Sequence, residues 1–501
     1  MLKSALVQLA PQPVPHHQHQ PHHLKIGKAV SSQPPQNMSP HKVEKHGEKP
    51  VVVVCAFPAS GHTNGLAQVS EYLVKQGFPV YFVIGTEWKA SAEKNGIICI
   101  ENPWYPSIET MTERENIPIG HDRIIFDLKY CFADSTPVVF PIFASALMRA
   151  RDEHPTRKVV ILHETLCQAV LPYSLGAPLP AGYDTLPPVI NWSTTHNVAT
   201  DYNVPPFGPG LPYDPTEENK ALWRTIHDAM IASAPVLNDY YNALYAPLGV
   251  TRRLTEFMWN PIMTFGDVTL FPTSAQADYP RAGPAAKRYK YIGGLPIKPL
   301  AADFVYPEWW PRITVNAKLP ADQRKKVALV TQGTVMHSYD ELLVPTIRAL
   351  AHREDLILVA TLGAKGAELD PALLGIPVPA NTIVVDYLPY DAVLPYADVF
   401  VSNAGFNGVV HGIMNAVPML LAGLEADKGE VCMRAEYAGV AVNLRATSPS
   451  EAQIVDGFNE LLTNKKYKAR AVELQEESKE LDPLGTVARM VLELADGTFK
   501  L

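Results

Sequence analysis

The chain has 501 residues, of which 47% are hydrophobic and 19% charged, so it is long enough for two or three domains with substantial cores. Its formal net charge is -8, and no Lys- and Arg-rich run is interleaved with aromatic residues, which argues against nucleic acid as a partner. The five cysteines are scattered without CxxC spacing, which argues against a disulfide framework or a thiolate zinc site.

The first 47 residues are predicted to be a disordered tail rich in His and Pro, because they show no hydrophobic periodicity. A solvated tail is the favoured interpretation, and metal binding by its histidines is the alternative. We expect a cytoplasmic location, with mitochondrial import as the alternative because no acidic residue precedes Glu44. No apolar run reaches the roughly 18 residues that span a bilayer, so no transmembrane segment is expected.

An α/β unit is predicted to begin at residue 51. The apolar run 51–54 is typical of a buried strand, a turn follows over 58–65, and a helix ends at Gly77 before a second strand over 78–84. This strand–loop–helix–strand order predicts a parallel sheet. A later strand of the same sheet is expected over 158–162.

The proline-rich segment 172–215 is predicted to be long loops, because proline interrupts helices and sheets. Its aromatic side chains include Trp192, Tyr202 and Phe207. Long loops in a compact domain are often functional, so we expect this segment to help bind an apolar ligand.

A second α/β unit is predicted after a linker. Its strands are expected over 327–331, 356–361, 383–385 and 399–401, and its helices are expected to begin at two capping boxes, residues 338–341 and 448–451. Open parallel sheets bind ligands beyond the carboxyl ends of their strands, so two such sheets facing each other predict a deep cleft.

The domain organisation expected from these elements has five parts. They are a tail (1–47), an N-terminal α/β domain (48–300), a linker (301–324), a C-terminal α/β domain (325–480) and a C-terminal helix (481–501) returning to the N-terminal domain.

Residues 402–408, Ser-Asn-Ala-Gly-Phe-Asn-Gly, separate two apolar runs. The chain must turn there from a strand into a helix, and a helix N-terminus offers free N–H donors and a partial positive charge that suit a diphosphate. Gly405 and Gly408 leave space for such a group, and Asn403 and Asn407 add neutral donors. A plain strand-to-helix turn is the alternative.

Several common motifs are missing from the sequence. Neither half has GxGxxG after its first strand, and the chain contains no Walker loop, HExxH or GxSxG. An oxidoreductase built from two Rossmann halves is therefore disfavoured, although it stays as an alternative.

An ordered set of motifs resembles the family 1 UDP-glycosyltransferases, closest to bacterial and fungal members with a Glu-x-Asp-Lys donor motif. The resemblance implies the GT-B architecture, in which two doubly wound, Rossmann-like α/β domains face each other across a cleft. The matching segments are 61–62, 291–296, 332–334, 387–390, 402–408, 416–419 and 425–428.

The resemblance also implies a UDP-sugar donor site in the second domain. Asn403, His411, Tyr387 and Lys428 replace the usual histidine, glutamate, tryptophan and glutamine, which contact phosphate, ribose, uracil and sugar respectively. Asp427 is expected to contact the sugar hydroxyls, while Lys428 pairs with Glu425 or Glu430 or faces the sugar. The expected donor-binding residues are Thr334, Tyr387, Leu388, Tyr390, Asn403, Gly405, Asn407, Gly408, His411, Asp427 and Lys428.

His62 matches the histidine that serves as general base in this family. An imidazole with a pKa of about 6.5 can accept a proton from an acceptor hydroxyl at neutral pH, provided that a carboxylate orients it. Family members use an aspartate about a hundred residues further on, after a strand, and Glu164 stands at the matching place.

The function implied is an inverting glycosyltransferase that moves a hexose, expected to be glucose, from a UDP-sugar to a hydroxyl of an apolar small molecule. No cofactor or metal is expected, because the sequence has no Asp-x-Asp motif of the kind used by metal-dependent glycosyltransferases. The alternative is a non-catalytic sugar-nucleotide-binding protein or partner subunit.

Overall fold

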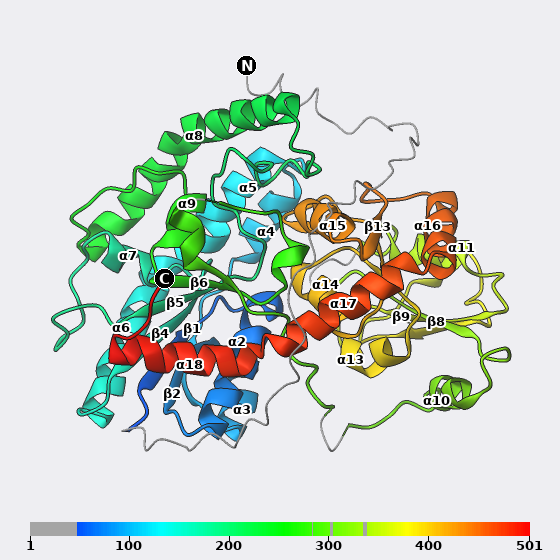
Figure 1. The fold of residues 1–501 in the computed structure, drawn as a ribbon, viewed down its shortest axis with the longest axis horizontal. Helices are drawn as coiled ribbons and strands as arrows, with labels where there is room; N and C mark the ends of the chain where they lie inside the picture. Colours follow the sequence, from blue (N-terminus) through cyan, green and yellow to red (C-terminus); the bar gives the residue numbers. More distant parts are fainter. Residues whose placement is uncertain (1–47, 283, 301–303, 334–337) are drawn as a thin grey trace, which may run out of the picture. The chain divides into compact units, whose positions relative to one another are not determined.

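Two parallel β-sheets, one within residues 51–291 and the other within residues 326–443, form the framework of the protein in the computed structural model (Figure 1). The structure describes residues 48–282, 284–300, 304–333 and 338–501. The predicted tail (1–47), part of the predicted linker (301–303) and Thr334 lie outside the described residues. Two doubly wound α/β units confirm the predicted fold class.

The first sheet has seven strands in the order β3-β2-β1-β4-β5-β6-β7, and every pairing is parallel. Its strands are β1 (Val51–Cys55), β2 (Val80–Gly85), β3 (Ile98–Asn102), β4 (Val159–Glu164), β5 (Val189–Trp192), β6 (Val268–Phe271) and β7 (Tyr289–Tyr291). Its helices are α2 (Ser60–Lys75), α3 (Thr86–Lys94), α4 (Ile108–Glu115), α5 (His121–Phe126), α6 (Thr136–Glu153), α7 (Leu171–Ser174), α8 (Glu217–Tyr245) and α9 (Trp259–Thr264).

The second sheet has six parallel strands in the order β10-β9-β8-β11-β12-β13. They are β8 (Lys326–Thr331), β9 (Leu356–Thr361), β10 (Thr382–Val385), β11 (Val399–Ser402), β12 (Met419–Leu421) and β13 (Ala441–Asn443). The helices from residue 311 onward are α10 (Pro311–Lys318), α11 (Leu343–Ala349), α12 (Pro371–Leu374), α13 (Tyr390–Val393), α14 (Phe406–Met414), α15 (Lys428–Tyr437), α16 (Glu451–Thr463), α17 (Lys466–Glu480) and α18 (Pro483–Asp496).

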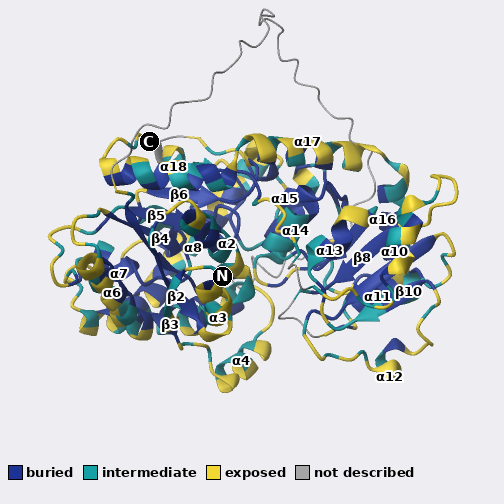
Figure 2. Cartoon of the chain, turned by 90° about the horizontal axis from the view of Figure 1, so that it is seen from below, coloured by how far each residue is buried: buried dark blue, intermediate teal, exposed yellow. Residues whose placement is uncertain are grey.

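The cores follow from the alternation of side chains along the strands. In β1, Val52 and Val54 face one apolar cluster, while Val51, Val53 and Cys55 face another. Figure 2 shows the buried residues concentrated in the sheets and the exposed residues on the outer surfaces of the helices. Both faces of each sheet are therefore covered, as a parallel sheet requires.

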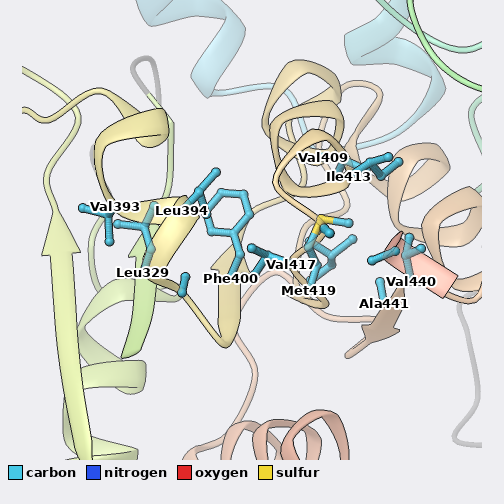
Figure 3. Close-up of a cluster of buried hydrophobic side chains, with 14 of the residues drawn as sticks. Leu329, Val393, Leu394, Phe400, Val409, Ile413, Val417, Met419, Val440 and Ala441 are labelled. Carbon is cyan, nitrogen blue, oxygen red and sulfur yellow. The ribbon is translucent and has the colours of Figure 1, made fainter. Parts of the chain in front are cut away.

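The apolar face of α14 is anchored on the second sheet (Figure 3). Val409 and Ile413 of this helix belong to the same buried cluster as Phe400, Met419 and Val440. This packing fixes the N-terminal end of α14, where the segment 402–408 was singled out from the sequence.

The last two helices run from the second sheet to the first (Figure 1). Helix α17 contacts α14, and α18 contacts α2 and β4. Val487 and Val491 of α18 are buried in the core of the first sheet. Residues 50–501 consequently form one compact unit.

Four local predictions were wrong in their boundaries. Helix α2 already begins at Ser60, inside the predicted turn, and β4 extends through Glu164. The predicted box at 338–341 is a turn, and the side chain of Gln332 instead accepts hydrogen bonds from the backbone at the start of α11. The second capping box uses Ser450 and Gln453 rather than 448–451.

The proline-rich segment also differs from its prediction. It contains most of α7 and all of β5. Of the three aromatic side chains singled out from the sequence, Trp192 and Phe207 are buried in apolar clusters. Tyr202 is exposed and donates to Asp228. These aromatic residues are therefore mainly structural.

One helical stretch of the described residues, His121–Glu153, has the length and apolar composition that a membrane-spanning helix needs. Core helices pass the same test, and here Val139, Phe143 and Leu147 are buried against the first sheet. The stretch is therefore not evidence for a membrane span.

Candidate active site

His62 and Glu164 meet at the carboxyl ends of β1 and β4. His62 lies in the first turn of α2, immediately after β1, and Glu164 is the last residue of β4. Since Cys55 is paired with His163 in the parallel register, the two chain segments leave the sheet side by side. The His62 Nδ1 atom lies 3.2 Å from Glu164 Oε1.

The environment of this pair favours a bound proton on His62. Burial lowers the pKa of His62, but the charge and the hydrogen bond of Glu164 raise it by more, so the pKa lies above its usual value. Burial raises the pKa of Glu164, but His62 lowers it by more. Because the ionised carboxylate of Glu164 lies beside Nδ1 of His62, the neutral imidazole carries its proton on Nδ1. Its Nε2 atom is then free to accept another proton.

A threonine hydroxyl touches both members of the pair. Thr194 Oγ1 donates to Glu164 Oε1 at 3.1 Å and lies 3.2 Å from His62 Nδ1. The backbone N–H of Leu166 also donates to Glu164 Oε1, at 3.0 Å. Thr165 Oγ1 donates to the same oxygen at 3.4 Å, so all of these contacts converge on Glu164 Oε1.

Two aromatic rings lie next to the ring of His62. The ring centroid of Phe57 lies 5.3 Å from that of His62, and the centroid of Phe132 lies 6.0 Å away. Trp104 in turn contacts Phe57 at 5.7 Å. These aromatic residues, rather than those of segment 172–215, give the base an apolar neighbourhood.

The turn between β11 and α14 takes its left-handed residue at Ala404, with φ 64°, and not at a glycine. A Cβ placed on Gly405 would meet no atom within 4 Å, so the space beside it is open. A Cβ on Gly408 would lie 3.8 Å from Ser402 Oγ. Room beside α14 therefore exists where the sequence suggested it.

Each of the two asparagines of this turn donates one side-chain hydrogen bond within the protein. Asn403 Nδ2 donates to the carbonyl of Gln332 at 2.6 Å. Asn407 Nδ2 donates to the carbonyl of Gly61, also at 2.6 Å, and so ties α14 to the residue before His62. Each amide keeps its second N–H for a ligand.

Residues 387–390 divide into surface and core. Tyr387 is 42% exposed and offers its ring as a stacking surface, while Leu388 is buried in the core and has only its backbone left for a ligand. Tyr390 packs against the ring of His411 at 5.9 Å. His411 Nδ1 is 3.0 Å from Asp391 Oδ1, which leaves Nε2 as its outward-facing polar atom.

Asp427 is the N-cap residue of α15, and Lys428, the first residue of that helix, borders a small hollow. Asp427 Oδ2 accepts a hydrogen bond from Thr195 Oγ1 at 3.0 Å. Lys428 lines the hollow, together with Gln332, Glu341, Asn403, Gly423 and Glu425.

The predicted pairing of Lys428 with Glu425 or Glu430 was wrong. Glu425 Oε1 instead lies 2.7 Å from Arg114 Nη1 and 2.8 Å from Arg123 Nη1. Glu430 Oε2 lies 2.6 Å from Arg434 Nη1. Lys428 lines the hollow, and its other alternative, a contact with the donor sugar, stays a prediction.

The same contacts join the two α/β halves. Glu425 belongs to the loop before α15, whereas Arg114 and Arg123 belong to α4 and α5 of the first half. Arg434 of α15 also forms a fully buried ion pair with Asp278 of the first half, at 2.7 Å. This ion pair is a second connection between the two halves.

Five contributors to this site were missed by the sequence analysis: Arg114, Arg123, Asp391, Thr194 and Thr195. The two threonines follow β5, and polar residues after a parallel strand are a known signal of a binding site. Because the segment was assigned to loops, that signal was not applied.

No group of three or more His, Cys, Asp or Glu side chains is placed to hold a metal ion within the described ranges. None of the five cysteines, all of which the structure describes, forms a disulfide. Cys55 and Cys167 form a hydrogen-bonded pair, with their Sγ atoms 3.2 Å apart.

Several known proteins are similar to this chain in sequence and in fold. The family model described as UDP-glucoronosyl and UDP-glucosyl transferase matches residues 233–488. UDP-glucosyltransferase 1 of Beauveria bassiana (strain ARSEF 2860) is 36% identical over 449 residues, covering 89% of this chain and 95% of that protein. UDP-glucosyltransferase B1 of Starmerella bombicola is 28% identical over 463 residues, covering 89% of this chain and 99% of that protein.

The crystal structure of the glycotransferase of kitacinnamycin superposes with a TM-score of 0.61 at 18% identity, covering 89% of this chain and all of that chain, and confirms the GT-B fold. The family model and the two relatives argue against the oxidoreductase alternative. The chain therefore belongs to the UDP-glucosyl transferase family and is a UDP-dependent glycosyltransferase.

Proposed function

We propose that the protein transfers glucose from UDP-glucose to a hydroxyl of an apolar small molecule, with inversion at the anomeric carbon and without a metal ion. The single observation that carries the proposal is the His62–Glu164 pair, 3.2 Å apart, one residue from the contact between Gly61 and the α14 helix. Base and expected donor site are thus neighbours.

The reaction is a single displacement. The acceptor oxygen attacks the anomeric carbon while His62 Nε2 takes its proton, and the bond from that carbon to the diphosphate oxygen breaks with its electron pair leaving on UDP. Glu164 stabilises the imidazolium that forms. One displacement inverts the configuration.

The departing diphosphate is stabilised by the chain itself in this proposal. The free N–H groups and partial positive charge at the start of α14, together with the spare N–H atoms of Asn403 and Asn407, face the growing negative charge. Tyr387 supplies a stacking surface for uracil, and His411 Nε2 supplies a polar atom for ribose.

The apolar acceptor is supported by Phe57 and Phe132, whose rings contact that of His62, and by Trp104, which contacts Phe57. A glucose donor is supported by the names of the relatives, two of which are UDP-glucosyltransferases.

The test is to incubate the protein with UDP-glucose and a panel of hydroxylated aromatic and aliphatic acceptors, and to identify the product by mass and by NMR. UDP-glucose is an α-linked donor, so a β-glucoside is expected. An α-glucoside would contradict the single displacement, and preference for strongly charged acceptors would contradict the role given to the aromatic residues.

A further inference from the structure

The short turn after β5, residues 193–197, touches both the proposed base and the carboxylate expected to bind the donor sugar. Thr194 Oγ1 contacts the His62–Glu164 pair, and the next residue, Thr195, donates to Asp427 of the other half. We propose that Thr194 and Thr195 are positioning residues, of which the first orients the base and the second orients the carboxylate that binds the donor sugar. The inference rests on the proposed function of His62.

The turn is held rigidly enough to position side chains. Ser193 N–H donates to the carbonyl of Leu270 in the sheet at 2.9 Å, and Ser193 Oγ donates to the carbonyl of Thr195 at 2.8 Å. At the far end, Asn197 N–H donates to Asp278 Oδ2 at 3.2 Å. Since Asp278 is itself paired with buried Arg434, the turn is fixed to both halves.

Thr194 governs how strongly Glu164 binds its histidine. Glu164 Oε1 accepts from His62, Leu166 and Thr194 and, at 3.4 Å, from Thr165, whereas Glu164 Oε2 is buried with no hydrogen-bond partner among the described residues. The Thr194 hydroxyl therefore takes up part of the negative charge that would otherwise act on His62. Without it, the carboxylate would stabilise the imidazolium more, and His62 would become a base only at higher pH.

Thr195 governs the direction of Asp427. Asp427 is the N-cap residue of α15, but its side chain makes no capping hydrogen bond. Thr195 Oγ1 donates to Oδ2 alone, so Oδ1 stays available for a sugar hydroxyl. The sugar-binding carboxylate of one half is thus aimed by a hydroxyl of the other half.

Adjacent residues suit this double task. The acceptor oxygen and the anomeric carbon must approach to about 3–3.5 Å in a defined direction before displacement. If base and sugar site were held by separate elements, small movements of the halves would change that distance. A single rigid turn keeps the two carboxylates, Glu164 and Asp427, in a fixed relation.

The experiment compares isosteric Thr194→Val and Thr195→Val, each with a serine variant that keeps the hydroxyl. Thr225→Val is the matched control, because its hydroxyl bonds only within α8 on the exposed surface. Two measurements need no knowledge of the acceptor: NMR titration of His62 in histidine-labelled protein, assigned with His62→Ala, and calorimetric binding of UDP-glucose and of UDP.

We expect Thr194→Val to move the His62 titration to higher pH and to leave UDP-glucose binding unchanged. We expect Thr195→Val to weaken UDP-glucose binding about 10-fold, the low end of the scale for one hydrogen bond to a charged group, with UDP binding unchanged. Both serine variants and Thr225→Val should behave as the natural protein does.

An unchanged His62 titration in Thr194→Val, or equal weakening of UDP and UDP-glucose in Thr195→Val, would overturn the inference. Serine variants that match the valine variants would do the same, because they would assign the effect to packing. Full transfer activity in His62→Ala would instead remove the proposed base, and the binding results for Thr195 would still stand.

Discussion

Replacing Glu425 by glutamine tests the connection between the two halves most sharply. The carboxylate is 4% exposed and accepts from Arg114 at 2.7 Å and from Arg123 at 2.8 Å. The glutamine side chain would keep the shape and one acceptor but lose the charge. A charge-assisted hydrogen bond is about twice as strong as a neutral one, so each contact loses about 1 kcal/mol and the unit about 2 kcal/mol.

For a unit of this size, that loss corresponds to a decrease in Tm of about 2 °C. Glu425 lies two residues before Asp427, so the KM for UDP-glucose should rise several-fold as well. Differential scanning calorimetry and initial rates measure the two effects. Glu115→Gln is the matched control, since Glu115 contacts the same Arg114 at 3.5 Å but is 62% exposed, and exposed pairs contribute little.

The pH dependence follows from the pKa of Glu425. Burial raises this pKa, but Arg114, Lys428 and Arg123 lower it by more, so the folded-state pKa lies below its usual value. The stability that this carboxylate contributes is therefore fully present above the unfolded-state pKa of about 4.3. It is lost as the pH falls through the lower folded-state pKa. The Tm difference between the natural protein and Glu425→Gln should shrink at low pH. Equal Tm values for the two at pH 7 would refute the reasoning.

The site itself supports three further predictions. Glu164→Gln should move the acidic limb of kcat/KM to lower pH while reducing its maximum, because burial then lowers the pKa of His62 against only the weaker effects of Asp427 and Cys167; a pH–rate profile checks this. Asp427→Ala should reduce transfer from UDP-glucose about 100-fold, with UDP affinity unchanged by calorimetry. Excess chelator should leave the transfer rate of the full chain unchanged, and restoration of a lost rate by Mg²⁺ or Mn²⁺ would contradict the metal-free proposal.

The sequence predicted the strands that consist of continuous apolar residues. The run 356–361 was assigned with the same bounds as β9, because a strand buried on both faces leaves few polar residues to confuse its limits. The strand β5 was missed because it has only four residues and follows Pro187 and Pro188. The carbonyl of Pro188 nevertheless accepts from Ile161 N–H, which shows that proline is tolerated where only the carbonyl joins the ladder.

The pairing of His62 with Glu164 could be proposed from spacing and resemblance, since both follow neighbouring strands. The contact of Thr195 with Asp427 could not, because 232 residues separate them and their strands belong to different sheets. The left-handed residue of the β11–α14 turn was also beyond the sequence, which offered two glycines nearby while the chain uses Ala404. An alanine with positive φ costs on the order of 1 kcal/mol, and surrounding contacts hold it there.

The central claim is that His62 removes the proton of the acceptor hydroxyl. The most direct test is single-turnover transfer from UDP-glucose by His62→Ala, with the UDP affinity of the variant measured beside it. The account predicts a rate at least ~100-fold below that of the natural protein, the usual scale for a positioned base, at unchanged UDP affinity. A transfer rate equal to that of the natural protein would contradict it.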